Sequence, residues 1–238
     1  AETRAHAEGW RARARFRVGA HSARRELFPL RHALLASARA VIVHSPYLES
    51  GVRLERPAVP VFHVPHGVRD DFSPNDRSTA RASLGLDALG VNDETILCLS
   101  FGLVQPHKRI AVALEAVRRA RAGGVDVRYA LVGPRSPDFD LDAAIRDHAL
   151  GGAVHVIDDF PLIETVALWI RAADVGINLR GPSSGGTSGA LLKMMALGLP
   201  TIATAVPELT HLAPDAVRFV ATGAREVHDV ASAIEEWA

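Results

Sequence analysis

The chain has 238 residues, 48% of them hydrophobic and 23% charged, and its 27 basic side chains balance 27 acidic ones. This composition is typical of a globular chain with room for one large or two small domains, and the zero net charge argues against a general nucleic-acid-binding protein. Apolar runs are interrupted within about ten residues, well short of the ~18 that a membrane-spanning helix needs. The single cysteine, Cys98, excludes an internal disulfide framework and a cysteine-based metal cluster, and we expect a cytoplasmic protein.

Positive charge gathers near the N-terminal end. Residues 1–32 contain eight arginines and three glutamates, a net charge of +5, so the remainder carries −5. Two interpretations stay open: a solvated arginine-rich helix, or a surface that rests peripherally on the anionic inner face of a membrane. Only two of the basic residues are lysines, Lys108 and Lys193, and in a chain where arginine is the default cation their positions are informative.

The first 66 residues predict a strand-helix-strand unit. Its predicted elements are, in chain order, a helix over 24–37, a strand over 40–44, a helix over 47–56 and a strand over 60–64. Two parallel strands do not make a stable sheet alone, so we expect residues 1–66 to be the remnant of a Rossmann-like domain whose beginning this chain lacks. Residues 67–94 are rich in Gly, Pro and polar side chains and predict an interdomain linker with one short helix.

Strands and helices alternate regularly over residues 95–238. The predicted strands cover residues 96–101, 127–132, 154–157, 175–179, 201–203 and 217–220. The predicted helices cover residues 110–122, 141–149, 163–172, 189–197, 207–212 and 226–237. This alternation implies right-handed crossovers and a parallel sheet with helices on both faces. We therefore predict an α/β, doubly wound, Rossmann-like domain in this part of the chain.

Ligands of doubly wound domains bind beyond the carboxyl ends of the strands, so the loops there are candidate sites. The loop after the first strand contains Gly102, which allows close backbone approach, and ends in Lys108 and Arg109. Cations are unfavourable at the start of a helix unless an anion offsets them. This loop therefore predicts an anion site, although a solvated helix start would give the same residues.

A second loop runs over residues 180–189. It begins with Arg180, and the residues that open the following helix are Gly186, Thr187, Ser188 and Gly189. Free backbone N–H groups and the positive end of the helix dipole converge at such a start and favour an anion. Glycine-rich turns also occur without a ligand, but this loop and Lys108 would face one crevice, where together they would hold a diphosphate.

A third loop, after the strand over 154–157, contains Asp159 and Phe160. These two residues are candidates for contact with the ribose or base of a nucleotide. Cys98 falls inside a predicted central strand, where a small buried core residue is expected.

Five blocks of the sequence, taken in order, resemble the nucleotide-sugar-dependent glycosyltransferases of the GT-B fold, the family-4-type or group 1 glycosyl transferases. The blocks are Val64–Val68 with Phe72–Pro74, Ser100–Gly102 with Lys108–Arg109, Ala130–Gly133, Ala173–Ile177, and Arg180–Gly189 with Leu192–Pro200 and Pro207–Leu209. The resemblance covers about residues 40–220. Each block alone is weak, and their order makes the set specific.

The resemblance implies a sugar donor site between two Rossmann-like halves. It implies transfer of a sugar from a nucleotide-diphosphate sugar to a carbohydrate or glycolipid acceptor, with retained anomeric configuration and without a metal or other cofactor. Lys108 would be catalytic, stabilising charge on the leaving phosphate. The diphosphate would be bound by Gly102, Lys108, Arg109, Arg180, Gly186, Thr187, Ser188 and Gly189.

The chain also departs from the family pattern. Two glutamates eight positions apart are expected where Gly185 and Lys193 stand, and an arginine is expected where Leu103 stands. Lys193 therefore takes the position that meets the ribose or base, and either Arg180 or Lys193 would supply the second positive charge. Two alternatives follow: another GT-B nucleotide-sugar enzyme, such as an epimerase, or a non-catalytic module that binds a nucleotide or a partner.

Overall fold

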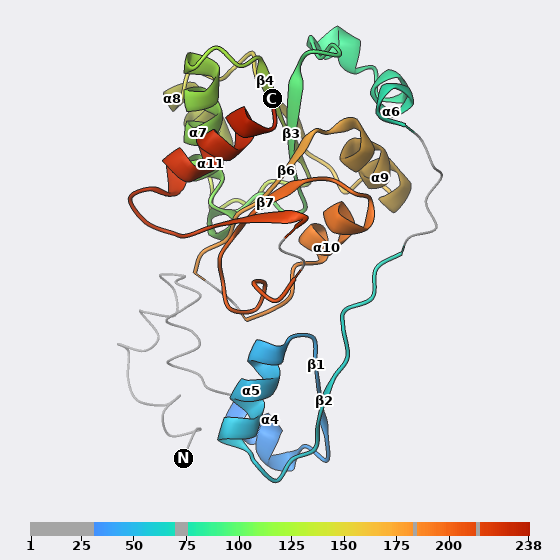
Figure 1. Ribbon diagram of the computed structural model, residues 1–238, viewed down its shortest axis with the longest axis vertical. Coiled ribbons are helices and arrows are strands. Elements are labelled where there is room, and N and C mark those ends of the chain that lie inside the picture. The colour runs from blue at the N-terminus through green and yellow to red at the C-terminus, as the bar shows by residue number, and fades with distance from the viewer. Residues whose placement is uncertain (1–30, 70–75, 183–184, 213–214) are drawn as a thin grey trace. The chain divides into compact units, whose positions relative to one another are not determined.

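The computed structural model describes residues 31–69, 76–182, 185–212 and 215–238 (Figure 1). The chain divides into two compact units, one formed by the residues up to His66 together with Pro182–Thr187, and one by Gly67–Gly181 with Ser188–Ala238. Most of the arginine-rich segment, and with it the first part of the helix predicted over 24–37, lies outside the described residues. None of the helices in the described ranges has the length and apolarity that a membrane crossing requires.

The first unit holds a two-stranded parallel sheet. Its elements are α4 (Arg31–Ser37), β1 (Val41–Val43), α5 (Pro46–Glu55) and β2 (Val61–His63). Helix α5 begins because the Ser45 hydroxyl caps it and Pro46 occupies its first turn. Ile42 and Phe62 are register partners on the two strands, and their side chains remain 65% and 55% exposed.

The second unit contains a six-stranded sheet in which every neighbouring pair is parallel. Its strands are β3 (Ile96–Phe101), β4 (Val127–Val132), β5 (Val154–Ile157), β6 (Val175–Asn178), β7 (Thr201–Thr204) and β8 (Val217–Val220). Their order in the sheet is β5-β4-β3-β6-β7-β8. This is the doubly wound order, which confirms the predicted α/β class and puts the reversal of strand order between β3 and β6.

Helices cover both faces of this sheet (Figure 1). One face packs against α7 (Ile110–Ala122), α8 (Leu141–Asp147) and α11 (Glu226–Glu236), and the other against α6 (Arg77–Ser83), α9 (Ile163–Ala172) and α10 (Gly189–Ala196). Gly176 of β6 allows α10 to approach, because a Cβ there would lie 2.7 Å from the Met194 sulfur. Cys98 is fully buried in this core, as predicted.

The segment predicted as a linker contributes to the second unit. It forms α6 and a 3₁₀ turn, η1 (Leu86–Leu89), and it buries Ala80 and Leu86 against α9. The Arg81 guanidinium is 6% exposed and donates to the carbonyls of Ala172 and Thr95 and to the Asp174 carboxylate. Its polar composition predicted a linker with one short helix, and the structure attaches the segment to the domain through this ion pair and the buried apolar residues.

One predicted helix is wrong. Residues 207–212 form successive turns, in which Leu209 N donates to Val206 O and Leu212 N to Leu209 O, both at 2.9 Å. Six residues are too few for a helix to propagate without strong support. The segment is instead held by burial of Val206 and Leu209 in a small cluster with Leu191 of α10.

Candidate functional site

The loops after β3 and β6 leave from adjacent strands at the point where strand order reverses. In a doubly wound sheet this switch point opens a crevice at the carboxyl edge, which is where ligands bind. The loop after β3 carries Lys108 and the loop after β6 carries Arg180. The topology therefore brings together the two loops that sequence analysis associated with a diphosphate.

The first loop is shaped around the Lys108 side chain. Lys108 ends a short 3₁₀ turn, η2 (Pro106–Lys108), and its Nζ donates to the Phe101 carbonyl at 2.6 Å, so that the side chain folds back onto the end of β3. Gly102 has a φ of 90°, and a Cβ at this position would lie 2.9 Å from Nζ. The backbone conformation therefore favours glycine at position 102, and a side chain there would also displace the Lys108 ammonium.

The ammonium of Lys108 is poorly neutralised. In the part of the chain that the structure describes, its hydrogen bond goes to a neutral carbonyl and it forms no ion pair. Burial, followed by repulsion from Arg180, lowers the pKa of Lys108 from 10.5 to about 8. A desolvated cation of this kind at a switch point is a strong candidate for anion recognition.

Arg180 follows β6 and is fixed through its backbone. Its N–H donates to the Thr204 hydroxyl at 2.9 Å, at the end of β7. Burial lowers the pKa of the half-buried Arg180, and attraction to Glu208 opposes that effect. Glu208 is fully buried in the turns after β7. The second cation of the site is therefore attracted by a buried carboxylate and repels Lys108.

Arg109 is placed differently from Lys108. Its guanidinium forms a two-pronged ion pair with Glu226, the first residue of α11, with Nε donating at 2.7 Å and a terminal nitrogen donating to the other oxygen. Glu226 is 1% exposed. The predicted diphosphate ligand Arg109 is thus committed to a buried carboxylate in the structure.

The start of α10 contains two further predicted residues. The Ser188 hydroxyl is buried, accepts from Leu191 N at 3.2 Å as the helix cap and exchanges a hydrogen bond with Asn178. Gly189 opens the helix, and Lys193 Nζ bonds weakly, at 3.5 Å, to the Gly189 carbonyl. Because the Ser188 hydroxyl is already hydrogen-bonded within the protein, a ligand at this helix start would meet the Ser188 backbone rather than its hydroxyl. Gly186 and Thr187 belong to the first unit.

Asp159 and Phe160 follow the edge strand β5, two strands away from β3. Both are exposed, and Asp159 Oδ1 accepts a hydrogen bond from the Phe160 amide at 2.7 Å. Phe160 presents 76% of its surface to solvent, which leaves an aromatic face open for stacking. Their predicted contact with a ribose or base stays a prediction.

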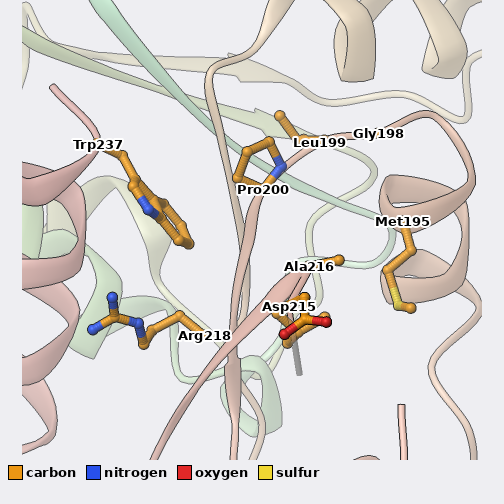
Figure 2. A pocket seen from close by; sticks show the side chains of 9 residues that line it. Met195, Gly198, Leu199, Pro200, Asp215, Ala216, Arg218 and Trp237 are labelled. Carbon is orange, nitrogen blue, oxygen red and sulfur yellow. The ribbon is translucent and has the colours of Figure 1, made fainter. Parts of the chain in front are cut away.

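A cavity of about 450 Å³ lies away from these loops (Figure 2). It is lined by residues that precede or begin β7 and β8, such as Pro200 and Val217, and by Trp237 beyond α11. Because the strands are parallel, these amino ends lie at the edge opposite the carboxyl ends that carry Lys108 and Arg180. The cavity contains none of the predicted site residues.

Two carboxylates of the site were missed in sequence analysis as site residues, Glu208 and Glu226. Both are essentially inaccessible, with 0% and 1% exposure, and each faces an arginine of the switch-point loops. Glu208 stood within a matched family block, so a signal existed. Glu226 reads as an ordinary acidic first residue of a helix, which carries no such signal.

Known glycosyltransferases are similar to this chain in sequence. Residues 94–238 match the family model described as Glycosyl transferases group 1. The D-inositol 3-phosphate glycosyltransferase of Geodermatophilus obscurus is 31% identical over 181 residues, 72% of this chain and 38% of the relative. One from a Nocardioides species is 31% identical over 159 residues, 60% of this chain and 33% of the relative. The chain thus spans 33–38% of the length of these relatives.

Solved structures share the fold. Sucrose-phosphate synthase from Thermosynechococcus elongatus superposes with a TM-score of 0.73 at 24% identity, covering 93% of this chain and 55% of that one. HepE of Anabaena, solved in complex with UDP and glucose, gives 0.65 at 19% identity, covering 84% and 53%. These likenesses agree with the expected GT-B type. Because the matched family model covers more than half of the chain, the chain belongs to the Glycosyl transferases group 1 family.

Proposed function

We propose that this chain carries the donor-binding domain of a glycosyltransferase that moves a sugar from a nucleotide-diphosphate sugar to a carbohydrate or glycolipid acceptor, with retention of configuration. The observation that carries the proposal is the half-buried Lys108 ammonium, whose pKa is lowered by desolvation and by Arg180, at the switch point of the doubly wound sheet. Family membership and the relatives' names support the reaction class. The UDP and glucose bound in the HepE structure support the donor class.

In the proposed reaction Lys108 is the catalytic residue. Negative charge grows on the diphosphate as the bond to the sugar breaks, and an ammonium that already sits desolvated at that point stabilises the transition state more than the ground state. Arg180 adds a second positive charge, and the backbone at Gly189 adds helix N–H groups. Two cations at the leaving group supply the charge that a divalent metal would otherwise provide, so we propose a reaction that needs no metal.

The charge of the N-terminal segment supports one further element of the proposal. Residues 1–32 carry a net charge of +5, which would hold the protein on anionic lipid next to a glycolipid acceptor. Binding to vesicles containing phosphatidylserine should then weaken as salt rises. Binding that is indifferent to salt would contradict this electrostatic contact.

Calorimetric titration of the chain with UDP, GDP and ADP tests the donor site. One of them should bind, and Lys108→Ala should weaken that binding by about 10–100-fold, the value of a lost charge-assisted hydrogen bond. Arg180→Ala should have a comparable effect. The control is Arg218→Ala, an exposed arginine at the opposite edge of the sheet that pairs with Glu236. Equal affinity of Lys108→Ala and the parent chain would contradict the proposal.

A further inference from the structure

Lys108 and Arg109 are consecutive cations with different surroundings. The Arg109 backbone lies in the left-handed region, with φ 53° and ψ 38°, at the junction between η2 and α7. That conformation favours glycine and is strained for a residue with a side chain. The Arg109 N–H donates to the Pro106 carbonyl at 3.0 Å, and contacts of the Arg109 side chain add to this backbone hydrogen bond.

The Arg109 side chain links three parts of the domain. Both prongs of its guanidinium reach the buried Glu226 of α11, a geometry that fixes orientation as well as charge. The same side chain covers Gly181, where a Cβ would lie 3.2 Å from Arg109 Cδ. Gly181 N in turn donates to the His107 carbonyl at 2.8 Å. The loop after β3, the loop after β6 and the start of α11 therefore meet around one guanidinium.

Glu226 also affects the charge around Lys108, because it neutralises the neighbouring Arg109. The charged and titratable groups around Lys108 are His107 and Arg109 on its own segment and Arg180 from the loop after β6, with Glu208 and Glu226 behind the two arginines. With Arg109 neutralised by Glu226, the repulsion on Lys108 comes chiefly from Arg180. Without the carboxylate, the partly buried Arg109 would be a second positive neighbour of Lys108.

From this geometry we infer that Arg109 and Glu226 form a positioning pair: their ion pair holds the loop that carries Lys108, and Arg109 itself does not contact the donor. The inference rests on the proposed function and deepens it by assigning the two adjacent cations opposite roles. Lys108 is the cation presented to the diphosphate. Arg109 anchors the loop to α11, and Glu226 neutralises the charge of Arg109 so that it does not repel Lys108.

The first test needs no nucleotide. The full chain contains two lysines, so ¹³C-lysine NMR follows Lys108 directly, and Lys193→Arg assigns the two signals. Glu226→Gln leaves Arg109 unbalanced and should lower the Lys108 titration midpoint by about half a pH unit or more, whereas Arg109→Met leaves a buried carboxylate and should raise it. The double variant should titrate near the parent midpoint. Parent-like midpoints in both single variants would overturn the inference.

The second test uses UDP, GDP and ADP as probes. If Arg109 positions Lys108, Glu226→Gln and Arg109→Met each weaken binding about tenfold, and the double variant loses no more than either single one. If Arg109 were a ligand, Glu226→Gln would release it and leave affinity unchanged or tighter, which overturns the inference. Absence of binding by the parent chain counts against the proposed function alone, because the NMR titration still judges the pair.

Arg109→Met leaves the buried Glu226 carboxylate without its partner, and Glu226→Gln leaves the partly exposed Arg109 unpaired, so each single variant endangers the fold. The double variant removes both charges and so keeps the charge balance, which guards the test against misfolding. With a folded double variant, monitored by thermal unfolding, the inference expects a parent-like Lys108 midpoint together with weakened nucleotide binding, because the anchor is lost while the charges remain balanced. Parent-like binding by a folded double variant would show that the pair positions nothing.

Discussion

The amino and carboxyl ends of the six-stranded sheet surround their cations in opposite ways. At the amino edge, Arg81 and Arg77 both reach the Asp174 carboxylate, whose second oxygen also accepts from Leu97 N. At the carboxyl edge, Lys108 bonds to a carbonyl and is repelled by Arg180. In the first arrangement both arginines pair with a carboxylate, and the pairing supports structure. The second arrangement leaves positive charge that a bound anion would neutralise. The group with which a cation pairs therefore distinguishes a structural cation from a ligand-binding one better than its burial does.

The largest expected effect lies at the amino edge. Arg81→Ala leaves Asp174 buried without its main partner and should lower the free energy of unfolding by about 3–5 kcal/mol. Arg77→Ala removes the other arginine from the same carboxylate, but its side chain is 50% exposed and the change should cost about 0–1 kcal/mol. Urea unfolding followed by circular dichroism measures both. Equal losses of stability in the two variants would contradict the comparison, because the exposure of the arginine side chain would then have no effect.

At the carboxyl edge, replacing the cation should stabilise the fold. The pKa of Lys108 is lowered from 10.5 to about 8, so the folded chain bears the full penalty below about pH 8 and none above 10.5. Lys108→Met should therefore be more stable than the parent by about 2–3 kcal/mol at pH 7, with the difference shrinking as pH rises to 10. Urea unfolding at several pH values measures this difference. A constant difference across that range would contradict the assigned titration.

The smallest expected effect concerns the loop that shapes the lysine pocket. Gly102→Ala forces a Cβ toward Lys108 Nζ and strains a backbone with φ 90°, so nucleotide affinity should fall about tenfold, the equivalent of ~1.4 kcal/mol. Gly223→Ala is the matched control, since Gly223 also has a positive φ, 133°, but open space around it. Titration calorimetry with the bound nucleotide compares them. If both variants lost stability but kept their nucleotide affinity, Gly102 would not be part of the nucleotide site.

Much of this domain is predictable from its sequence because local patterns govern it. The strands β3, β4, β5 and β8 and the helices α7 and α9 have the predicted bounds, since each combines the right period of apolar residues with clear breaks. The order of alternation then fixes a parallel, doubly wound sheet, and that topology alone brings the loops of Lys108 and Arg180 to neighbouring strands. The turns over 207–212 were missed because their form depends on distant packing.

The tertiary structure decided which charges are satisfied. Sequence analysis assigned both Lys108 and Arg109 to the diphosphate, because both follow the same glycine and precede the same helix. Only folding brings Glu226, 117 positions later, onto Arg109, while Lys108 turns back to the Phe101 carbonyl. Likewise, the polar segment that contains Arg81 packs against the domain, and its ion pair with Asp174 is formed only in the folded chain. Periodicity is a local property that a sequence displays, whereas pairing of buried charges is non-local, and three dimensions are needed to show which cation remains available to an anion.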